Sequence, residues 1–382
     1  MENTLTVVIR LNPTKEQKNL IDSSSLAYIN LINELVEEMV ELKVSTKKTT
    51  ANIVAPLNSS VKNQALRDSK SVFKKAKKTR YKIVPVLTKT VCIWNNQNYS
   101  YDDNSIAMPF MVDGKSKKIS IKANITDRTK DLLSNTLGTL RVTKKGNKYI
   151  AQISVITEST PSLGENTVGV DLGILVPAVA YCSSEKVKFF GNGRKNKYTR
   201  RRFKTLRQKL GKLKKTKAIK TINNKEQRIM NNLDHKVSRD IVNFAKDNNA
   251  SIIKLEQLSN IRKSARTSRK NAKNIHNWSF YRLSMYIEYK ARLRGIIVEY
   301  VNPAFTSQTC PSCSIRNKAK GRSYTCECGY QRHRDLVGAI NISRSEKIEE
   351  IVKTPKKKSI IEKIFNFDKN AQYNMFGDLI LA

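Results

Sequence analysis

Four cysteines in the C-terminal third of the chain constrain its fold more than any other feature. Their spacing is C-x2-C, then twelve residues, then C-x-C. Four thiolates in two pairs bind a structural Zn²⁺ tetrahedrally, as in a zinc ribbon. The second pair has one intervening residue where two are usual, so His333 is an alternative ligand, but the preference for closed sites favours four thiolates. The predicted ligands are Cys310, Cys313, Cys326 and Cys328.

The other two cysteines, Cys92 and Cys182, stand alone in apolar runs and are expected to be small buried residues. The N-terminal residues, MENTLTVVIRL, lack the charged start and the apolar run of a signal peptide. In a chain without a secretion signal, clustered cysteines favour a metal over disulfides. We therefore expect a cytoplasmic protein.

The charge of the chain indicates a polyanionic partner. It has 72 Lys and Arg against 32 Asp and Glu, a formal net charge of +40. Self-repulsion of this size destabilises a compact fold unless a polyanion offsets it. Nucleic acid is the natural partner, because Lys and Arg contacts to phosphate release condensed counterions. No segment approaches the roughly 18 apolar residues of a membrane-spanning helix. A basic ribosomal-type protein without catalytic chemistry remains an alternative at this point.

The second half of the chain has the element order of an RNase H-like α/β domain. Three short strands, TVGVDLG, VPAVAYC and KVKFFG, are followed by a long basic helical region at about 197–249. The strand SIIKLEQL, a helix from about Trp278 to Arg294 and the strand IIVEYV come next. The cysteine segment then interrupts the domain before a final helix through LVGAINIS.

The first half of the chain reads differently. Residues 3–11 alternate as in a strand, and Pro13 and Thr14 then open a helical stretch that runs to about residue 80. Short β-like runs from 83 to about 157 suggest a small barrel or curled sheet, with the helical stretch inserted in it. Residues 161–166 read as a linker, and the basic tail from 347 is expected to be poorly ordered.

Three acids stand where an RNase H-like domain would place a metal site. Asp171 and Glu256 lie late in apolar strands, and Asp335 precedes an apolar helix. Taken singly, Asp171 could start a turn, Glu256 could pair with a lysine and Asp335 could cap a helix. Together, three converging carboxylates would repel one another without cations. Two Mg²⁺ ions about 4 Å apart would neutralise them and activate water for phosphodiester hydrolysis.

A basic helical run follows the third strand. The stretch 194–220 carries a Lys or Arg at about every second position. Such a run is usually a solvated helix face, but beside a nuclease-type site it suits a phosphate backbone. The basic loop 261–274 could form a lid over a substrate strand. The predicted nucleic-acid contacts are Arg200, Arg201, Arg202, Lys204, Arg207, Lys209, Lys212, Lys214 and Lys215.

These motifs, in this order, resemble the TnpB family of transposon-encoded RNA-guided endonucleases, which is related to compact type V CRISPR effectors. The resemblance covers most of the chain and is carried by IRLNPTKEQKNL, GVDLG, IIKLEQL, the stretch from HNWSFYRL to QTCPSC, and CECGYQRHRDLVGAINIS. The C-x-C pair and VGA before Asn341 and Ile342 depart from the family pattern. By resemblance, the RuvC triad carries over to Asp171, Glu256 and Asp335, and the zinc ligands to the four clustered cysteines.

The resemblance implies a guide RNA made from the transposon end and a double-stranded DNA target with a short adjacent motif. It also implies Mg²⁺, with Mn²⁺ as a substitute, and a nucleoid-associated location. Rival functions are a nuclease-inactive RNA-guided repressor, a DNA-joining transposase and a small CRISPR effector. The implied domains are a wedge-like β-barrel (1–13 and 81–163), a helical recognition insertion (14–80), a RuvC-like domain (164–304 and 333–346), a zinc ribbon that binds target nucleic acid (305–332) and the tail (347–382).

Overall fold

The computed structural model describes residues 1–258 and 278–348. This part of the chain forms two compact units. One is Thr4–Thr157, and the other combines Met1–Asn3 with the described residues from Glu158 onward. The predicted lid and nearly all of the predicted basic tail lie outside the described residues. None of the described helices is long and apolar enough to cross a membrane.

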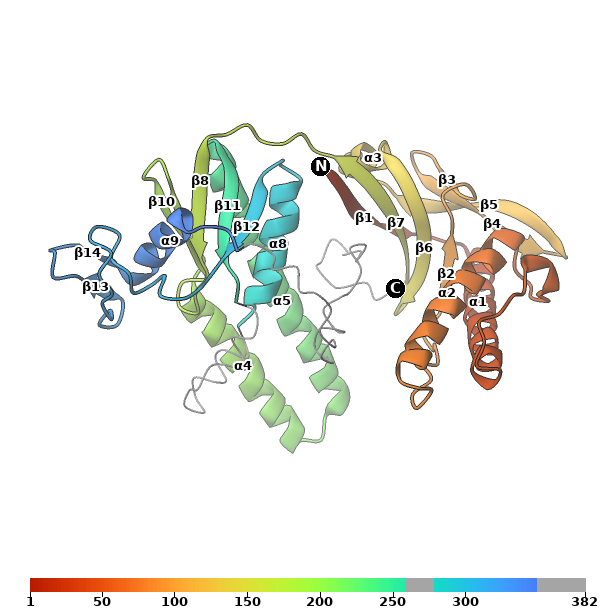
Figure 1. The fold of residues 1–382 in the computed structure, drawn as a ribbon. Coiled ribbons are helices and arrows are strands. Elements are labelled where there is room, and N and C mark those ends of the chain that lie inside the picture. The colour runs from red at the N-terminus through yellow and green to blue at the C-terminus, as the bar shows by residue number, and fades with distance from the viewer. Residues whose placement is uncertain (259–277, 349–382) are drawn as a thin grey trace. The chain divides into compact units, whose positions relative to one another are not determined.

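The first unit is built on a seven-stranded sheet with the order β2-β6-β7-β1-β5-β4-β3 (Figure 1). Strand β1 pairs with β5, β5 with β4, β4 with β3, β2 with β6 and β6 with β7, all antiparallel. Strands β2 and β3 stand at the two edges of this order, and closure into a barrel stays a prediction. The strands are β1 (Glu2–Leu11), β2 (Val91–Trp94), β3 (Ser100–Tyr101), β4 (Ser105–Val112), β5 (Lys115–Asn124), β6 (Thr136–Lys145) and β7 (Lys148–Glu158).

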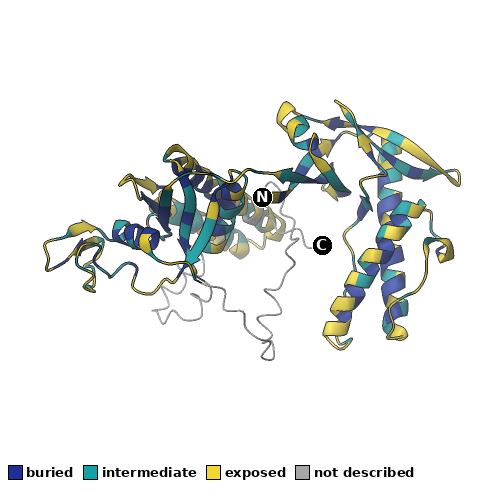
Figure 2. Ribbon diagram, turned by 45° about the horizontal axis from the view of Figure 1, so that its top comes forward, coloured by how far each residue is buried: buried dark blue, intermediate teal, exposed yellow. Residues whose placement is uncertain are grey.

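Two long helices, α1 (Lys15–Glu41) and α2 (Ser59–Lys78), pack together in this unit. Each buries one side and exposes the other (Figure 2). Helix α1 begins at a capping box, in which the Thr14 hydroxyl accepts from the Gln17 N–H and the Gln17 side chain accepts from the Thr14 N–H. Between the helices, Tyr28 donates a hydrogen bond to Asp68 at 2.7 Å. A short helix, α3 (Asp127–Leu133), was not expected from the sequence.

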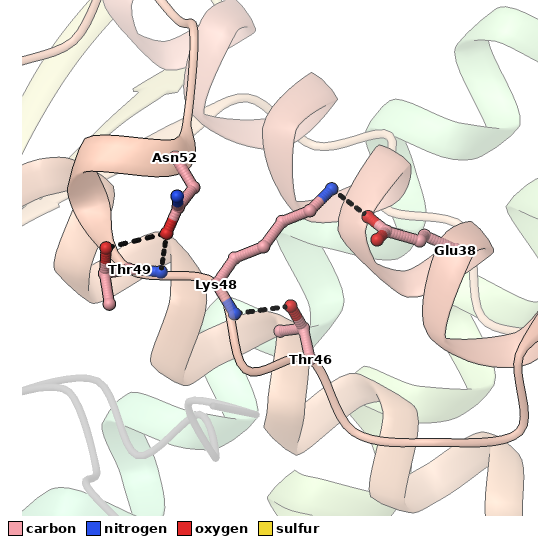
Figure 3. A network of polar contacts seen from close by, with 5 residues as sticks. All are labelled: Glu38, Thr46, Lys48, Thr49 and Asn52. Carbon is pink, nitrogen blue, oxygen red and sulfur yellow. Dashed lines mark hydrogen bonds and ion pairs between the residues drawn. The ribbon is translucent and has the colours of Figure 1, made fainter.

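The predicted continuous helical stretch is wrong for residues 42–58, which hold only the short 3₁₀ turn η1 (Thr50–Asn52). Polar side chains fix this connection (Figure 3). The Lys48 ammonium donates to Glu38 of α1 at 2.6 Å, and the Asn52 side chain accepts from the N–H and the hydroxyl of Thr49. The hydrogen-bonding side chains of Thr46, Thr49 and Asn52 favour such turns over helix.

The second unit contains a five-stranded sheet with the order β10-β9-β8-β11-β12. The first three strands in the chain pair antiparallel, whereas β11 is parallel to both β8 and β12. This mixed topology is that of an RNase H-like sheet, and all five predicted strands are confirmed. They are β8 (Asn166–Asp171), β9 (Ala178–Cys182), β10 (Val187–Phe190), β11 (Ala250–Glu256) and β12 (Ile297–Val301).

Helices accompany this sheet (Figure 1). The predicted basic helical region is two helices that form a hairpin, α4 (Gly193–Lys212) and α5 (Thr216–Asp247). The break falls at Lys214, which has a left-handed backbone (φ 54°). Helix α8 (Phe280–Arg292) packs against α5, and α9 (Arg334–Arg344) packs against β8. The contact of α9 is close because Gly169 of β8 has no side chain, and a Cβ there would lie 2.2 Å from the Ala339 carbonyl oxygen.

Candidate active site and four-cysteine cluster

Strand topology brings the first two predicted acids together. Asp171 is the last residue of β8, and Glu256 is the last residue of β11. The two strands are neighbours and parallel, and Val170 pairs with Leu255. Both carboxylates therefore stand at the same edge of the sheet, where the carboxyl ends of strands commonly hold ligands.

Helix α9 brings the third acid to this edge. Asp335 is its second residue and is buried, with 6% of its surface exposed. One turn further along, a Cβ on Gly338 would lie 3.0 Å from Asp171 Oδ2, so the helix runs directly over the first carboxylate. His333 caps α9, because its Nδ1 accepts from the Asp335 N–H at 3.3 Å. The three predicted acids thus gather in one place, although they come from distant parts of the sequence.

The electrostatics of this place favour a cation. Burial, followed by the charges of Glu256 and Asp335, raises the pKa of Asp171 well above its ordinary value. Burial also raises the pKa of Glu256, although a hydrogen bond from Thr306 lowers it in part. Buried carboxylates that destabilise one another in this way are stabilised by a positive partner. The donor set, which is all carboxylate oxygen, suits Mg²⁺ or Mn²⁺.

Two further side chains contact the acids. The Thr306 hydroxyl donates to Glu256 Oε1 at 2.5 Å, and the Arg322 guanidinium pairs with Asp335 Oδ1 at 2.5 Å. The other Asp335 oxygen, Oδ2, is buried without a hydrogen-bond partner. An unpartnered buried carboxylate oxygen is costly, and a metal ion at this point would remove the cost. Neither Thr306 nor Arg322 was identified from the sequence, because neither belongs to a spacing pattern that indicates a ligand.

The four clustered cysteines meet as predicted. Their sulfur atoms all lie within 4.8 Å of one another, and they could hold a structural zinc. Within residues 1–258 and 278–348, this is the only group of three or more Cys, His, Asp or Glu whose ligand atoms come so close, and the three acids are spaced more widely. Strands β13 (Ser323–Thr325) and β14 (Gln331–His333) form a small hairpin around the second pair. His333 is outside this group.

The ionisation of one thiol also suits a metal. Burial raises the pKa of the Cys310 thiol, but hydrogen bonds from the backbone of Cys313 and Ser312 and from neighbouring thiols together lower it to about 7. The side-chain amide of Asn317 donates to the Cys326 sulfur at 3.0 Å. Zinc binds the thiolate form, so these donors favour the state that a metal needs.

The predicted nucleic-acid contacts on the α4–α5 hairpin fall into two groups. Arg207 forms an ion pair with Glu226, and burial lowers the pKa of the half-buried Arg200. These two arginines line a cavity of about 410 Å³ together with Trp278. The other seven side chains are exposed and can meet a phosphate backbone: Arg201, Arg202, Lys204, Lys209, Lys212, Lys214 and Lys215.

Sheet topology, the three gathered acids and the cysteine cluster define a RuvC-type effector fold. Among solved structures, the chain is similar to a Cas12f1–sgRNA–target DNA complex, with a TM-score of 0.64 at 14% identity over 90% of this chain and 98% of that one. This likeness concerns the fold. Residues 280–342 match the model of the Cas12f1-like TNB domain.

Curated relatives give the same answer. The chain is 36% identical over 121 residues to the TnpB-like protein MJ0751 of Methanocaldococcus jannaschii, a match that covers 31% of this chain and 43% of the relative. It is 31% identical over 137 residues to the CRISPR-associated endodeoxyribonuclease Cas12f1 of Sulfoacidibacillus thermotolerans, covering 35% and 31%. The chain thus spans less than half the length of these relatives. Together, the matches support the TnpB and compact type V family, and confirm the resemblance seen in the sequence motifs.

Proposed function

We propose that the protein is an RNA-guided DNA endonuclease of transposon origin, which cuts double-stranded DNA beside a short adjacent motif. The observation that carries this proposal is the meeting of Asp171, Glu256 and Asp335 at one sheet edge. Further support comes from the net charge of +40 and from relatives named as TnpB-like protein and endodeoxyribonuclease. A nuclease-inactive repressor would not need three acids that destabilise one another.

Asp171, Glu256 and Asp335 would hold two Mg²⁺ ions, or Mn²⁺ in their place. When bound, such ions lower the pKa of water and stabilise the charge that develops on a phosphodiester. The protein's own side chains fix the acids that hold them. Thr306 restrains Glu256 through its hydrogen bond, and Arg322 balances the charge of Asp335. Arg334 also lies near Asp171, where its charge favours the ionised carboxylate.

The remaining parts receive roles within this proposal. The guide RNA, made from the transposon end, pairs with the target strand, and the protein senses the A-form shape of the duplex. The wedge-like domain (1–13 and 81–163) and the helical insertion (14–80) read the adjacent motif. The RuvC-like domain (164–304 and 333–346) cuts, the zinc ribbon (305–332) holds target nucleic acid, and the tail (347–382) adds charge. The protein acts on DNA in the cytoplasm, at the nucleoid.

The RNA that co-purifies with the protein tests guide use directly. After expression from its native locus, we expect a discrete RNA species whose constant part derives from the transposon end and whose 3′ end is variable flanking sequence. Sequencing of this RNA checks the prediction, and a repeat-derived constant part would indicate a CRISPR effector instead. A protein that carries only random cellular RNA would contradict guide use.

Binding of nucleic acid should weaken steeply as salt rises, since phosphate contacts release counterions. Replacing four exposed lysines of the hairpin by alanine should flatten the plot of log affinity against log salt by about three units, at 0.7–0.9 per contact. The matched control replaces the same lysines by arginine and should keep the slope. Fluorescence anisotropy between low and high salt measures both, and an unchanged slope in the alanine variant would remove this surface from the interface. The four are Lys209, Lys212, Lys214 and Lys215.

A further inference from the structure

An exposed aromatic ring stands beside the three carboxylates. Phe305 exposes 45% of its surface, although a phenylalanine is normally most stable when buried. It directly precedes Thr306, whose hydroxyl bonds to Glu256. The ring is therefore one residue away from a side chain that touches the second acid.

The backbone at Phe305 is unusual and firmly held. Its φ of 62° is in the left-handed region, which bulky residues rarely adopt. The Phe305 carbonyl accepts from the N–H of Gln308 and of Thr309 and from the Thr309 hydroxyl, at 2.9, 3.0 and 3.1 Å. The side-chain amide of Asn341 in α9 donates to the carbonyls of Thr306 and Thr309, each at 2.7 Å. The turn is thus tied to Glu256 and to the helix that carries Asp335.

A guanidinium group lies over the same ring. The Arg316 guanidinium carbon is 3.9 Å from the Phe305 ring centroid. Arg316 is placed there by an antiparallel bridge to Thr309, at the end of the Phe305 turn. An aromatic face with an adjoining Arg is the combination that proteins use for unpaired bases, because the ring stacks on the base and the cation suits its phosphate.

We propose that Phe305 and Arg316 form a stacking site for one unpaired nucleobase of the strand that reaches the three acids. The site rests on the proposed function and deepens it, since it adds a positioning residue for the substrate strand. A non-glycine residue in a left-handed conformation at a candidate site is strain that a functional role can explain. Every base has a π face, so the site tolerates any sequence, as a cutter guided by RNA requires.

Replacing Phe305 by glycine separates this role from a structural one. Glycine adopts a positive φ without strain, so Phe305→Gly should melt no lower than the parent, and Phe305→Asn offers a second variant suited to this backbone. The parent is the full-length Asp171→Asn protein, which leaves the probes uncut. The probes are fluorescein-labelled strands of about twelve nucleotides, one of thymidine and one abasic throughout.

We expect Phe305→Gly to lower affinity for the thymidine strand by roughly five- to hundredfold and to leave affinity for the abasic strand unchanged. Phe305→Tyr should bind like the parent. Tyr281→Ala, which removes another exposed aromatic ring on α8, is the matched control and should also bind like the parent. Equal losses for both strands, or no loss for thymidine, would overturn the stacking site.

This test is independent of the proposed function. If the active protein never cuts DNA but the thymidine preference disappears in Phe305→Gly, the endonuclease proposal fails and the stacking site stands. If the active protein cuts a matched target and Phe305→Gly keeps the preference, the endonuclease proposal stands and the stacking site fails.

Discussion

Replacing Asp171 with asparagine is expected to abolish cutting of a matched DNA target while RNA binding stays nearly intact. Asp171 lies between Glu256 and Asp335, and its loss removes a ligand for the ions that stabilise the reacting phosphate. Several kcal/mol of such stabilisation correspond to a rate loss of at least about a thousandfold. Cleavage of a guide-matched plasmid in Mg²⁺, measured as linear product against time, checks the loss.

The same variant should be more stable than the parent in buffer without added divalent ions. Burial and the neighbouring acids destabilise ionised Asp171, and a neutral amide removes this repulsion. Added Mg²⁺ should then raise the melting temperature of the parent more than that of Asp171→Asn, since only a ligand that binds the folded state stabilises it. If both proteins cut equally, or if Mg²⁺ raises both melting temperatures equally, the three acids do not form a shared metal site.

Replacing Cys310 with serine is expected to lose the zinc and to unfold the segment between β12 and α9. This segment has a small core, made of Tyr324 and Val337 with the buried cysteines Cys310 and Cys326. So few apolar side chains do not stabilise a fold alone, and binding of structural zinc supplies folding free energy of about 10–16 kcal/mol in small zinc domains. Zinc content by mass spectrometry and the yield of soluble protein measure the effect.

Cys92→Ala is the matched control for this variant. Cys92 is also buried, but it lies in β2 of the other unit and has no cysteine partner. The control should keep one zinc per chain, whereas Cys310→Ser should keep little or none. Undiminished zinc in Cys310→Ser would show that other residues hold the metal, and His333→Ala would then identify or exclude the histidine.

The nuclease-type half of the fold was predictable because its strands are short, apolar and separated by clear turns. The break of the basic helical region at Lys214 was not, since lysine is a good helix former and nothing in KLKKTK indicates a left-handed residue. The connection between α1 and α2 was missed for a related reason. Its turns depend on contacts such as that of Lys48 with Glu38, which apolar periodicity does not report.

The acids and the thiols could be predicted from local patterns, whereas their partners could not. Asp171 and Glu256 stand out as charges at the ends of apolar strands, and the cysteines stand out by spacing. Arg322 is one of many arginines and lysines in the chain, and only the folded hairpin shows that it pairs with Asp335. Phe305 likewise looks like an ordinary apolar residue until its backbone and exposure are known.

The close seat of α9 on Gly169 has a consequence for protein engineering. The first and third acids are held by one helix-on-strand contact, and the second is held by the next strand, so none of the three depends on the length of the cysteine segment. A longer or shorter segment could therefore be grafted between the Thr306 turn and the His333 cap. Such grafts would need to keep an arginine for Asp335, and would let the target-contacting part be exchanged without rebuilding the cutting site.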